Sequence, residues 1–261
     1  MKYKLIATDF DGTLLTDDKK ITIETKNTLK NIEDKYIIVG ATARNLGSVK
    51  SVCDINIFHY LILNNGACIY DVCSDKVIYE NYLDFKIVEK ISEKFKTIAG
   101  EIDYCCLNKY YKKKKESKFD SKDFIDNINN TDEIKEKVMR MNIFFDEYSD
   151  IEKYKKLIDD EYDCLNTFVM QDSNDVLKWL VVNPSETSKR TSLKRLGEYL
   201  NIGLDNMIYF GDGPNDIETI SSVGCGVAME NALLEVKKIA KNITLSNNDN
   251  GVAEFIKNLK K

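Results

Sequence analysis

Apolar and polar positions alternate in short blocks along the first 80 residues of the chain. Apolar runs rich in β-branched and aromatic residues predict strands at 3–10, 36–41, 60–65, 67–71 and 76–80. Between them, residues 23–33 and a stretch from about Asn45 have apolar positions at helical spacing. Strands that alternate with helices predict right-handed crossovers and a parallel sheet. The last two runs, joined by residues 72–75, predict a hairpin.

The pattern changes between residues 82 and 183. The predicted elements of this part are helices at 84–98 and 148–160 and strands at 138–146 and 174–182. Longer charged helices beside alternating strands are typical of a separate α+β unit. The basic run KYYKKKKESK at 109–118 also lies here. A solvated loop or hairpin tip explains this run better than an anion-binding patch.

Past Pro184 the alternation of the first part resumes. The predicted elements are helices at 189–200 and 251–261, strands at 206–210 and 225–229, and a helix after each of these two strands. We therefore expect an α/β protein with a Rossmann-like parallel-sheet core made of residues 1–81 and 184–261. Residues 82–183 are expected to form an inserted α+β domain.

Composition narrows the possible functions. The 261 residues carry a net charge of -5, which gives no reason to expect nucleic acid as a partner. No apolar run approaches the ~18 residues of a membrane span, and the N-terminus turns acidic before it could form a signal peptide. Seven scattered cysteines without a C-x-x-C pair are typical of reduced thiols. We expect a cytoplasmic protein without an obligate protein partner.

His59 is the single histidine of the sequence. Catalytic triads and histidine-rich zinc sites are almost excluded, because histidine is the usual general base and a frequent zinc ligand. An enzyme of this composition would depend on carboxylates, a lysine and metal ions that prefer oxygen ligands.

Acidic residues follow two of the predicted strands. Asp9 and Asp11 come at the end of the first strand, and Asp212 and Asp216 lie in GDGPND after a later one. Each pair alone is explained by a turn. Two acidic strand ends can also meet at one edge of a parallel sheet, where they supply oxygen ligands for Mg²⁺. GDGPND lacks the third glycine of a dinucleotide-binding motif, so that alternative is weak.

Two further residues gain meaning only in combination with the acidic ones. Thr42 follows the second strand, where its hydroxyl and the next N–H groups could meet an anion, although a helix N-cap explains a single threonine better. Lys189 opens a predicted helix and is, by itself, an ordinary surface lysine.

In this order, the motifs resemble those of the haloacid dehalogenase-like phosphohydrolases, particularly the Cof-type sugar phosphatases. The matching segments are DFDGT at 9–13, Thr42, LNNGA at 63–67, Lys189, GDGPND at 211–216, GVAMENA at 226–232 and DNGVAEFI at 249–256. The resemblance covers the whole chain. It implies a phosphatase acting on a small phosphorylated metabolite, with a sugar phosphate favoured, and an inserted cap that sets the choice of substrate.

The resemblance also implies a metal site. Mg²⁺ would be held by Asp9, the backbone carbonyl of Asp11 and Asp212. Asp216 would complete the acidic group and orient Lys189, which adds a second positive charge.

It implies covalent chemistry as well. Asp9 would attack phosphorus to form an aspartyl-phosphate, and Asp11 would protonate the leaving group and then activate water. Thr42 and Asn215 would hydrogen-bond phosphoryl oxygens. The further candidate substrate contacts are Gly12, Thr13, Arg44 and Asn65.

The chain departs from the family pattern where Ala43, Arg190 and Glu230 replace the usual glycine. Alanine tolerates positive φ poorly, so the turn at 42–44 could be reshaped, and Glu230 could weaken anion binding. Two other functions stay open at this point. A phosphomutase of the same superfamily would return the phosphoryl group to a sugar. A non-enzymatic phospho-acceptor or binding protein, like the shorter receiver domains, would also use Asp, Thr and Lys.

Overall fold

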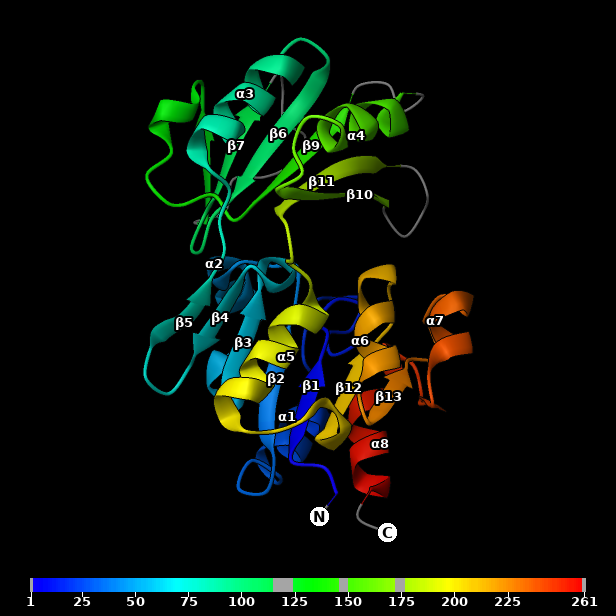
Figure 1. The fold of residues 1–261 in the computed structure, drawn as a ribbon. Helices are drawn as coiled ribbons and strands as arrows, with labels where there is room; N and C mark the ends of the chain where they lie inside the picture. Colours follow the sequence, from blue (N-terminus) through cyan, green and yellow to red (C-terminus); the bar gives the residue numbers. More distant parts are fainter. Residues whose placement is uncertain (1, 115–123, 146–149, 172–176, 260–261) are drawn as a thin grey trace. The chain divides into compact units, whose positions relative to one another are not determined.

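The computed structural model describes residues 2–114, 124–145, 150–171 and 177–259, and its backbone divides into two compact units (Figure 1). The first unit consists of Met1–Arg44, Val49–Tyr79 and Ser188–Lys261, and the second of Asn45–Ser48 and Glu80–Thr187. The core expected from the sequence ended at residue 81 and resumed at 184, close to the divisions at 79/80 and 187/188.

The first unit is built on an eight-stranded sheet in the order β14-β13-β12-β1-β2-β3-β4-β5. Its strands are β1 (Leu5–Thr8), β2 (Ile37–Ala41), β3 (Tyr60–Leu63), β4 (Cys68–Asp71), β5 (Lys76–Glu80), β12 (Met207–Gly211), β13 (Cys225–Ala228) and β14 (Asn242–Ile243). The six strands from β14 to β3 are parallel, and β4 runs antiparallel to β3. The expected α/β class with a parallel-sheet core is confirmed.

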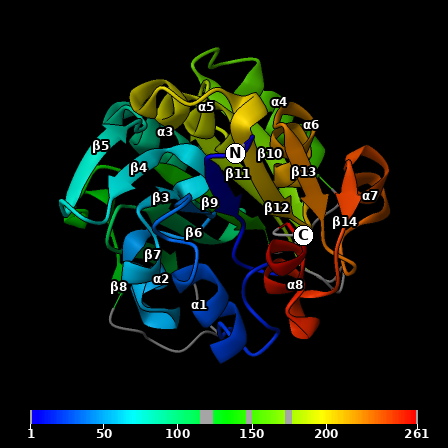
Figure 2. The same cartoon turned by 90° about the horizontal axis from the view of Figure 1, so that it is seen from below.

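Helices cover both faces of this sheet. They are α1 (Ile23–Lys30), α2 (Leu46–Val52), α5 (Lys189–Leu200), α6 (Ile217–Ser222), α7 (Leu234–Ile239) and α8 (Gly251–Asn258). Figure 2 shows α1 and α8 on one face and α5 and α6 on the other. A sheet covered in this way has strands buried on both sides, and all four residues of β1 are buried.

The strand order reverses beside β1. The chain passes from β1 to β2 and β3 on one side, and later returns as β12 on the other side of β1. Open α/β sheets bind ligands at such a switch point, beyond the carboxyl ends of the strands. The ends of β1 and β12 are therefore the first place to look for a site.

The second unit has a six-stranded sheet in the order β10-β11-β9-β6-β7-β8. Its elements are β6 (Ala99–Cys105), β7 (Tyr110–Lys114), β8 (Ile125–Ile128), β9 (Arg140–Phe145), β10 (Leu165–Gln171), β11 (Lys178–Pro184), α3 (Phe85–Phe95) and α4 (Ile151–Asp159). Side chains of one sheet face, such as Tyr104 and Ile143, form an apolar core with Val88 of α3 and Ile158 of α4. Alternate strand residues lie on the opposite face.

The basic run at 109–118 differs from the expected loop or hairpin tip. Tyr110–Lys114 forms β7, which pairs with β6 on one side and β8 on the other. The Nζ of Lys112 is 2.6 Å from Glu101 and 3.2 Å from Asp103 on β6, so the lysine is buried beside two counter-charges. Residues 115–118 lie outside the described part of the chain.

Other element limits shift by a few residues. The helix expected to reach residue 33 ends at Lys30, and the helix expected from 148 begins at Ile151. The strand expected from 174 begins at Lys178. Parts of four predicted elements, residues 146, 148–149, 174–176 and 260–261, lie outside the described residues. A helix long and apolar enough to cross a membrane is absent from the residues that the structure describes.

Candidate active site

The carboxyl ends of four adjacent parallel strands carry predicted site residues. β12, β1, β2 and β3 are directly followed by Asp212, Asp9, Thr42 and the Asn64–Asn65 pair. Backbone pairing fixes this edge, since the Asp9 N–H donates to the carbonyl of Phe210 over 2.9 Å. Because the strands are parallel, residues far apart in the sequence lie together at one end of the sheet.

Lys189 ties two of the carboxylates together. Its Nζ lies 2.6 Å from Asp9 Oδ1 and 2.8 Å from Asp216 Oδ1. The lysine is the first residue of α5 and is only 1% exposed. The side chain of Ser188 caps this helix by accepting the Thr191 N–H. The sequence taken alone gave this lysine no more than a surface role.

The electrostatics of this trio leave a surplus of negative charge. Burial alone would lower the pKa of Lys189, but the charges of Asp216 and Asp9 raise it above its usual value, so the ammonium is retained. Burial raises the pKa of Asp9 well above its usual value, even though Lys189 lowers it. One buried cation therefore does not fully compensate the carboxylates around it.

Asp216 organises the loop that follows β12. Its Oδ1 accepts hydrogen bonds from Lys189 and from the Tyr209 hydroxyl, the latter over 2.6 Å. Its Oδ2 accepts the N–H groups of Asp212 and Gly213, each over 3.1 Å. Four donors occupy the roughly four lone-pair positions of a carboxylate, so Asp216 is better suited to orienting Lys189 than to binding a metal directly. The sequence analysis did not predict a role for Tyr209. The only hint in the sequence was that its hydroxyl is the single polar side-chain group in an otherwise apolar strand and would need a hydrogen-bond partner.

Asp9, Asp212 and Asp216 form a group in which one carboxylate oxygen of each lies within 4.8 Å of the others. Burial and the charge of Asp216 raise the pKa of Asp212 to about 6, although Thr13 donates to its Oδ1 over 2.7 Å. Hard oxygen donors with excess negative charge are the ligand set that Mg²⁺ prefers. The donors present therefore fit a divalent cation held mainly by Asp9 and Asp212.

Gly12 makes room for this arrangement. Its φ is +77°, and a β-carbon added there would lie 2.8 Å from Cγ of Asp212. Asn231 donates to the Gly12 carbonyl over 2.7 Å and so fixes the turn. The glycine is required both by its left-handed backbone and by the closeness of Asp212.

Gly12→Ala is expected to weaken Mg²⁺ binding about 10- to 100-fold, because the added methyl group must displace the Asp212 carboxylate. The left-handed backbone adds a stability cost of about 1–2 kcal/mol. A calorimetric Mg²⁺ titration and urea unfolding measure the two effects.

Gly203→Ala is the matched control. Gly203 has a φ of -70°, and the nearest atom to an added β-carbon is 3.9 Å away. Equal effects of the two substitutions would contradict the steric role of Gly12.

The Asp11 carboxylate points to other partners. Arg44 donates to it through Nε and Nη2, each over 2.7 Å, and Lys19 lies 2.9 Å from Oδ1. Burial would raise the pKa of Asp11, but Arg44 and Lys19 lower it to about 2. Arg44, expected as a substrate contact, is thus paired with a candidate catalytic carboxylate. Lys19 was not foreseen.

Thr42 is not the N-cap of the following helix. The Ser48 N–H donates to Asn45 Oδ1 over 2.8 Å, so Asn45 provides the capping contact at the start of α2. Thr42 is 1% exposed, and its Oγ1 accepts the Arg44 N–H over 3.1 Å. The hydroxyl proton of Thr42 is therefore left for another acceptor.

Asn65 and Asn215 meet across the site edge. Asn215 Nδ2 donates to Asn65 Oδ1 over 3.1 Å. Asn65 has a φ of +56°, which asparagine tolerates better than most residues, and its N–H donates to the Thr42 carbonyl. The turns after β2, β3 and β12 are thus joined by hydrogen bonds.

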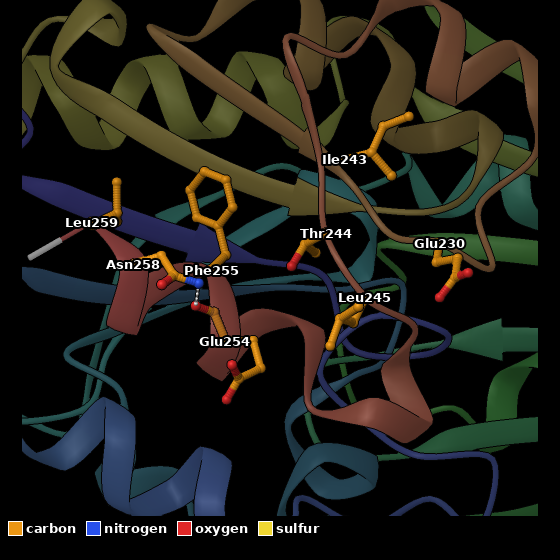
Figure 3. Close-up of a pocket in the computed structure, with 8 residues that line it drawn as sticks. All are labelled: Glu230, Ile243, Thr244, Leu245, Glu254, Phe255, Asn258 and Leu259. Atoms are coloured by element: carbon orange, nitrogen blue, oxygen red, sulfur yellow. Dashed lines mark hydrogen bonds between the residues drawn. The ribbon is translucent and has the colours of Figure 1, made fainter. Parts of the chain in front are cut away.

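The departures from the family pattern have mild consequences for the backbone. Among the described residues with positive φ, Ala43 does not appear, so alanine causes no such strain there. Arg190 is half-buried in the first turn of α5. Glu230 is exposed and lines a separate surface hollow of about 590 Å³ (Figure 3). The other residues of that hollow are Ile243, Thr244, Leu245, Glu254, Phe255, Asn258 and Leu259.

Comparison with known proteins gives consistent matches over nearly the whole chain. A family model described as haloacid dehalogenase-like hydrolase matches residues 6–256. Phosphatase YwpJ of Bacillus subtilis (strain 168) is 28% identical, over 98% of this chain and 99% of its own. A 5-amino-6-(5-phospho-D-ribitylamino)uracil phosphatase, YitU of the same organism, is 27% identical over 97% and 96%. The crystal structure of a haloacid dehalogenase-like hydrolase from Bacteroides thetaiotaomicron superposes with a TM-score of 0.84 at 29% identity, covering 98% of this chain and 99% of that one.

Proposed function

Because the chain belongs to the haloacid dehalogenase-like hydrolases and is a phosphatase of that family, we propose that it hydrolyses a sugar or sugar-alcohol phosphate with Mg²⁺ as its cofactor. The observation that carries this proposal is the group of Asp9, Asp212 and Asp216 around Lys189 at the switch point of the sheet. The relative named for a phosphoribitylamino compound supports a polyol phosphate as substrate. When bound, Mg²⁺ would offset negative charge on the carboxylates and on the incoming phosphate.

Asp9 is the proposed nucleophile. One of its oxygens forms a bond to phosphorus, and the bond from phosphorus to the alkoxide breaks, leaving an aspartyl-phosphate. Lys189 holds Asp9 by a 2.6 Å contact, and Asp216 in turn holds Lys189. This chain of contacts fixes the attacking carboxylate before the substrate arrives, and holding a reacting group in the right geometry lowers the activation barrier.

Asp11 is the proposed proton carrier. It would give a proton to the leaving alkoxide and take one from the water that hydrolyses the intermediate. A pKa of about 2 leaves this carboxyl ionised at neutral pH while Arg44 and Lys19 are bound to it. We therefore propose that the substrate phosphate competes for Arg44 and Lys19, and that Asp11 can hold a proton once they have moved to the phosphate.

Thr42 and Asn215 are the proposed donors to phosphoryl oxygens. Thr42 accepts one N–H and keeps its own proton to donate, and Asn215 uses one of its two amide protons on Asn65. Donors that face the reacting phosphoryl group stabilise the charge that develops on it. The second unit is proposed to act as the cap that selects the substrate.

The test is phosphate release from a panel of sugar phosphates, polyol phosphates, nucleotides and para-nitrophenyl phosphate, with Mg²⁺ or with EDTA. We expect release with Mg²⁺, loss of activity in EDTA, and recovery on adding excess Mg²⁺. Activity that survives EDTA would contradict the metal assignment. A panel ranking led by nucleotides would contradict the proposed substrate class.

A further inference from the structure

Tyr209 is a large residue with a polar group, buried in the middle of the parallel sheet. It pairs with Ala7 of β1 on one side and with Gly226 of β13 on the other. Directly paired residues direct their side chains to the same face of a sheet, so the ring has two of the smallest residues beside it. Tyr209 is 0% exposed, and the other side chains of β12 are apolar. The sheet thus makes room for an aromatic ring whose hydroxyl needs a partner inside the protein.

The partner of this hydroxyl is the carboxylate that also holds Lys189. Tyr209 donates to Asp216 Oδ1 over 2.6 Å, and Lys189 Nζ donates to the same oxygen over 2.8 Å. A hydrogen bond to a charged group is shorter and stronger than one between neutral groups. The Tyr209 hydroxyl therefore offsets part of the charge on this oxygen and limits how the carboxylate can turn.

Lys189 is shared between two carboxylates. Its Nζ also donates to Asp9 Oδ1 over 2.6 Å, and Asp9, Lys189 and Asp216 are all buried. Both carboxylates attract the same ammonium group, so a second donor on one of them leaves the ammonium freer to contact the other. Among the described residues, Tyr209 is that second donor on Asp216 Oδ1.

We propose that Tyr209 is a positioning residue, whose hydroxyl holds Asp216 so that Lys189 stays in contact with Asp9. The inference rests on the proposed function, because Asp9 is the nucleophile assigned there. Tyr209 acts on Asp9 through two intervening side chains and does not touch the substrate. Without the hydroxyl, the ammonium is drawn toward Asp216, and its hold on Asp9 weakens. The loss falls on the rate of attack more than on the binding of substrate.

The test is Tyr209→Phe, which removes one oxygen atom and keeps the ring. We expect kcat on para-nitrophenyl phosphate to fall about tenfold, the order expected when one hydrogen bond to a charged group is lost. KM should stay within about twofold of the wild-type value, because a residue that only positions the nucleophile leaves substrate binding intact. Steady-state kinetics at saturating Mg²⁺ measure both constants.

Tyr104→Phe is the matched control. Tyr104 is also 0% exposed, and its hydroxyl donates to Ser92 over 2.8 Å in the second unit, where its ring belongs to the apolar core. This variant also loses a buried hydrogen bond, so urea unfolding should show lower stability, but it should keep the wild-type kcat. An unchanged kcat in Tyr209→Phe would overturn the proposal, as would an equal fall in both variants or a rise in KM without a fall in kcat.

Crystal structures of the wild type and Tyr209→Phe without a metal ion test the geometry independently of activity. In the variant, we expect the contact between Lys189 Nζ and Asp9 Oδ1 to lengthen from its 2.6 Å. An unchanged contact would contradict the positioning role. If the wild type releases phosphate from no ester, the proposed function fails, and the two crystal structures alone decide this inference.

Discussion

Asp9→Asn is expected to lower the rate of phosphate release by at least about 10³-fold, because an amide oxygen is too weak a nucleophile to form the acyl phosphate. The substitution is nearly isosteric at a residue that is 7% exposed, so the fold should be kept. It also removes a carboxylate whose pKa burial raises well above the usual value, so little stability is lost. The measurement is phosphate release at saturating Mg²⁺, accompanied by thermal unfolding.

Asp17→Asn is the control for this experiment. Asp17 also follows the first strand, but its contacts are the amides of Asn247 and Asn248. This variant should turn over at close to the wild-type rate. Comparable activity in Asp9→Asn and wild type would contradict the role of Asp9 as nucleophile. If Asp9→Asn lost activity because it unfolded, the experiment would be repeated with Asp9→Ala to separate loss of chemistry from loss of folding.

Lys189→Met should be the most destabilising single change at the site. It removes the cation that lies 2.6 Å from Asp9 and 2.8 Å from Asp216, and breaking a buried ion pair in this way costs about 3–5 kcal/mol. We expect phosphate release to be lost as well, because Asp9 is no longer held in place. Urea unfolding in EDTA measures the free energy without a metal ion.

The cost of Lys189→Met should grow with pH. Carboxyl groups whose pKa is raised on folding bind protons more readily in the folded state, so stability falls as pH rises through the folded pKa. Asp9 and Asp212, the latter with a pKa of about 6, are such groups, and losing Lys189 raises both pKa values further. The variant should be closest to wild type near pH 5 and furthest from it above pH 7.

Lys194→Met, on the same helix, provides the comparison. Lys194 is exposed and forms only a 3.8 Å pair with Glu198, worth less than about 0.5 kcal/mol. A similar loss of stability in both lysine variants, or a loss that does not depend on pH, would argue against an electrostatic role for Lys189.

The sequence predicted the site best where acidic residues directly follow strands of the parallel sheet. Asp9 and Asp212 each follow an apolar strand, and a parallel sheet brings such strand ends together whatever lies between them. The catalytic roles of Asp9 and Asp212 stay predictions, but the prediction that they lie close together required only the order of the strands and helices. The central strands were predictable for the same reason, since strands buried on both faces read as continuous apolar runs.

Charged residues with partners from distant strands could not be foreseen. A run of lysines looks solvated until Lys112 is placed beside Glu101 and Asp103, which come from a neighbouring strand. The pairing of Arg44 with Asp11 and the Tyr209 hydroxyl under Asp216 likewise depend on side-chain directions. Hydrophobic periodicity reports which face is buried, not which polar groups satisfy one another there.

The position of β12 in the chain has a consequence for how the protein is made. β1 pairs with β12, so Leu5 cannot form its backbone pairing with Met207 until roughly 200 further residues have been synthesised. At a synthesis rate of about 5–20 residues per second, this delay lasts about 10–40 s. The six strands of the second unit are complete by Pro184, 23 residues before β12 begins at Met207. During translation, the second unit can therefore fold around its own core while β1, which can already pair with β2, still lacks β12 on its other edge.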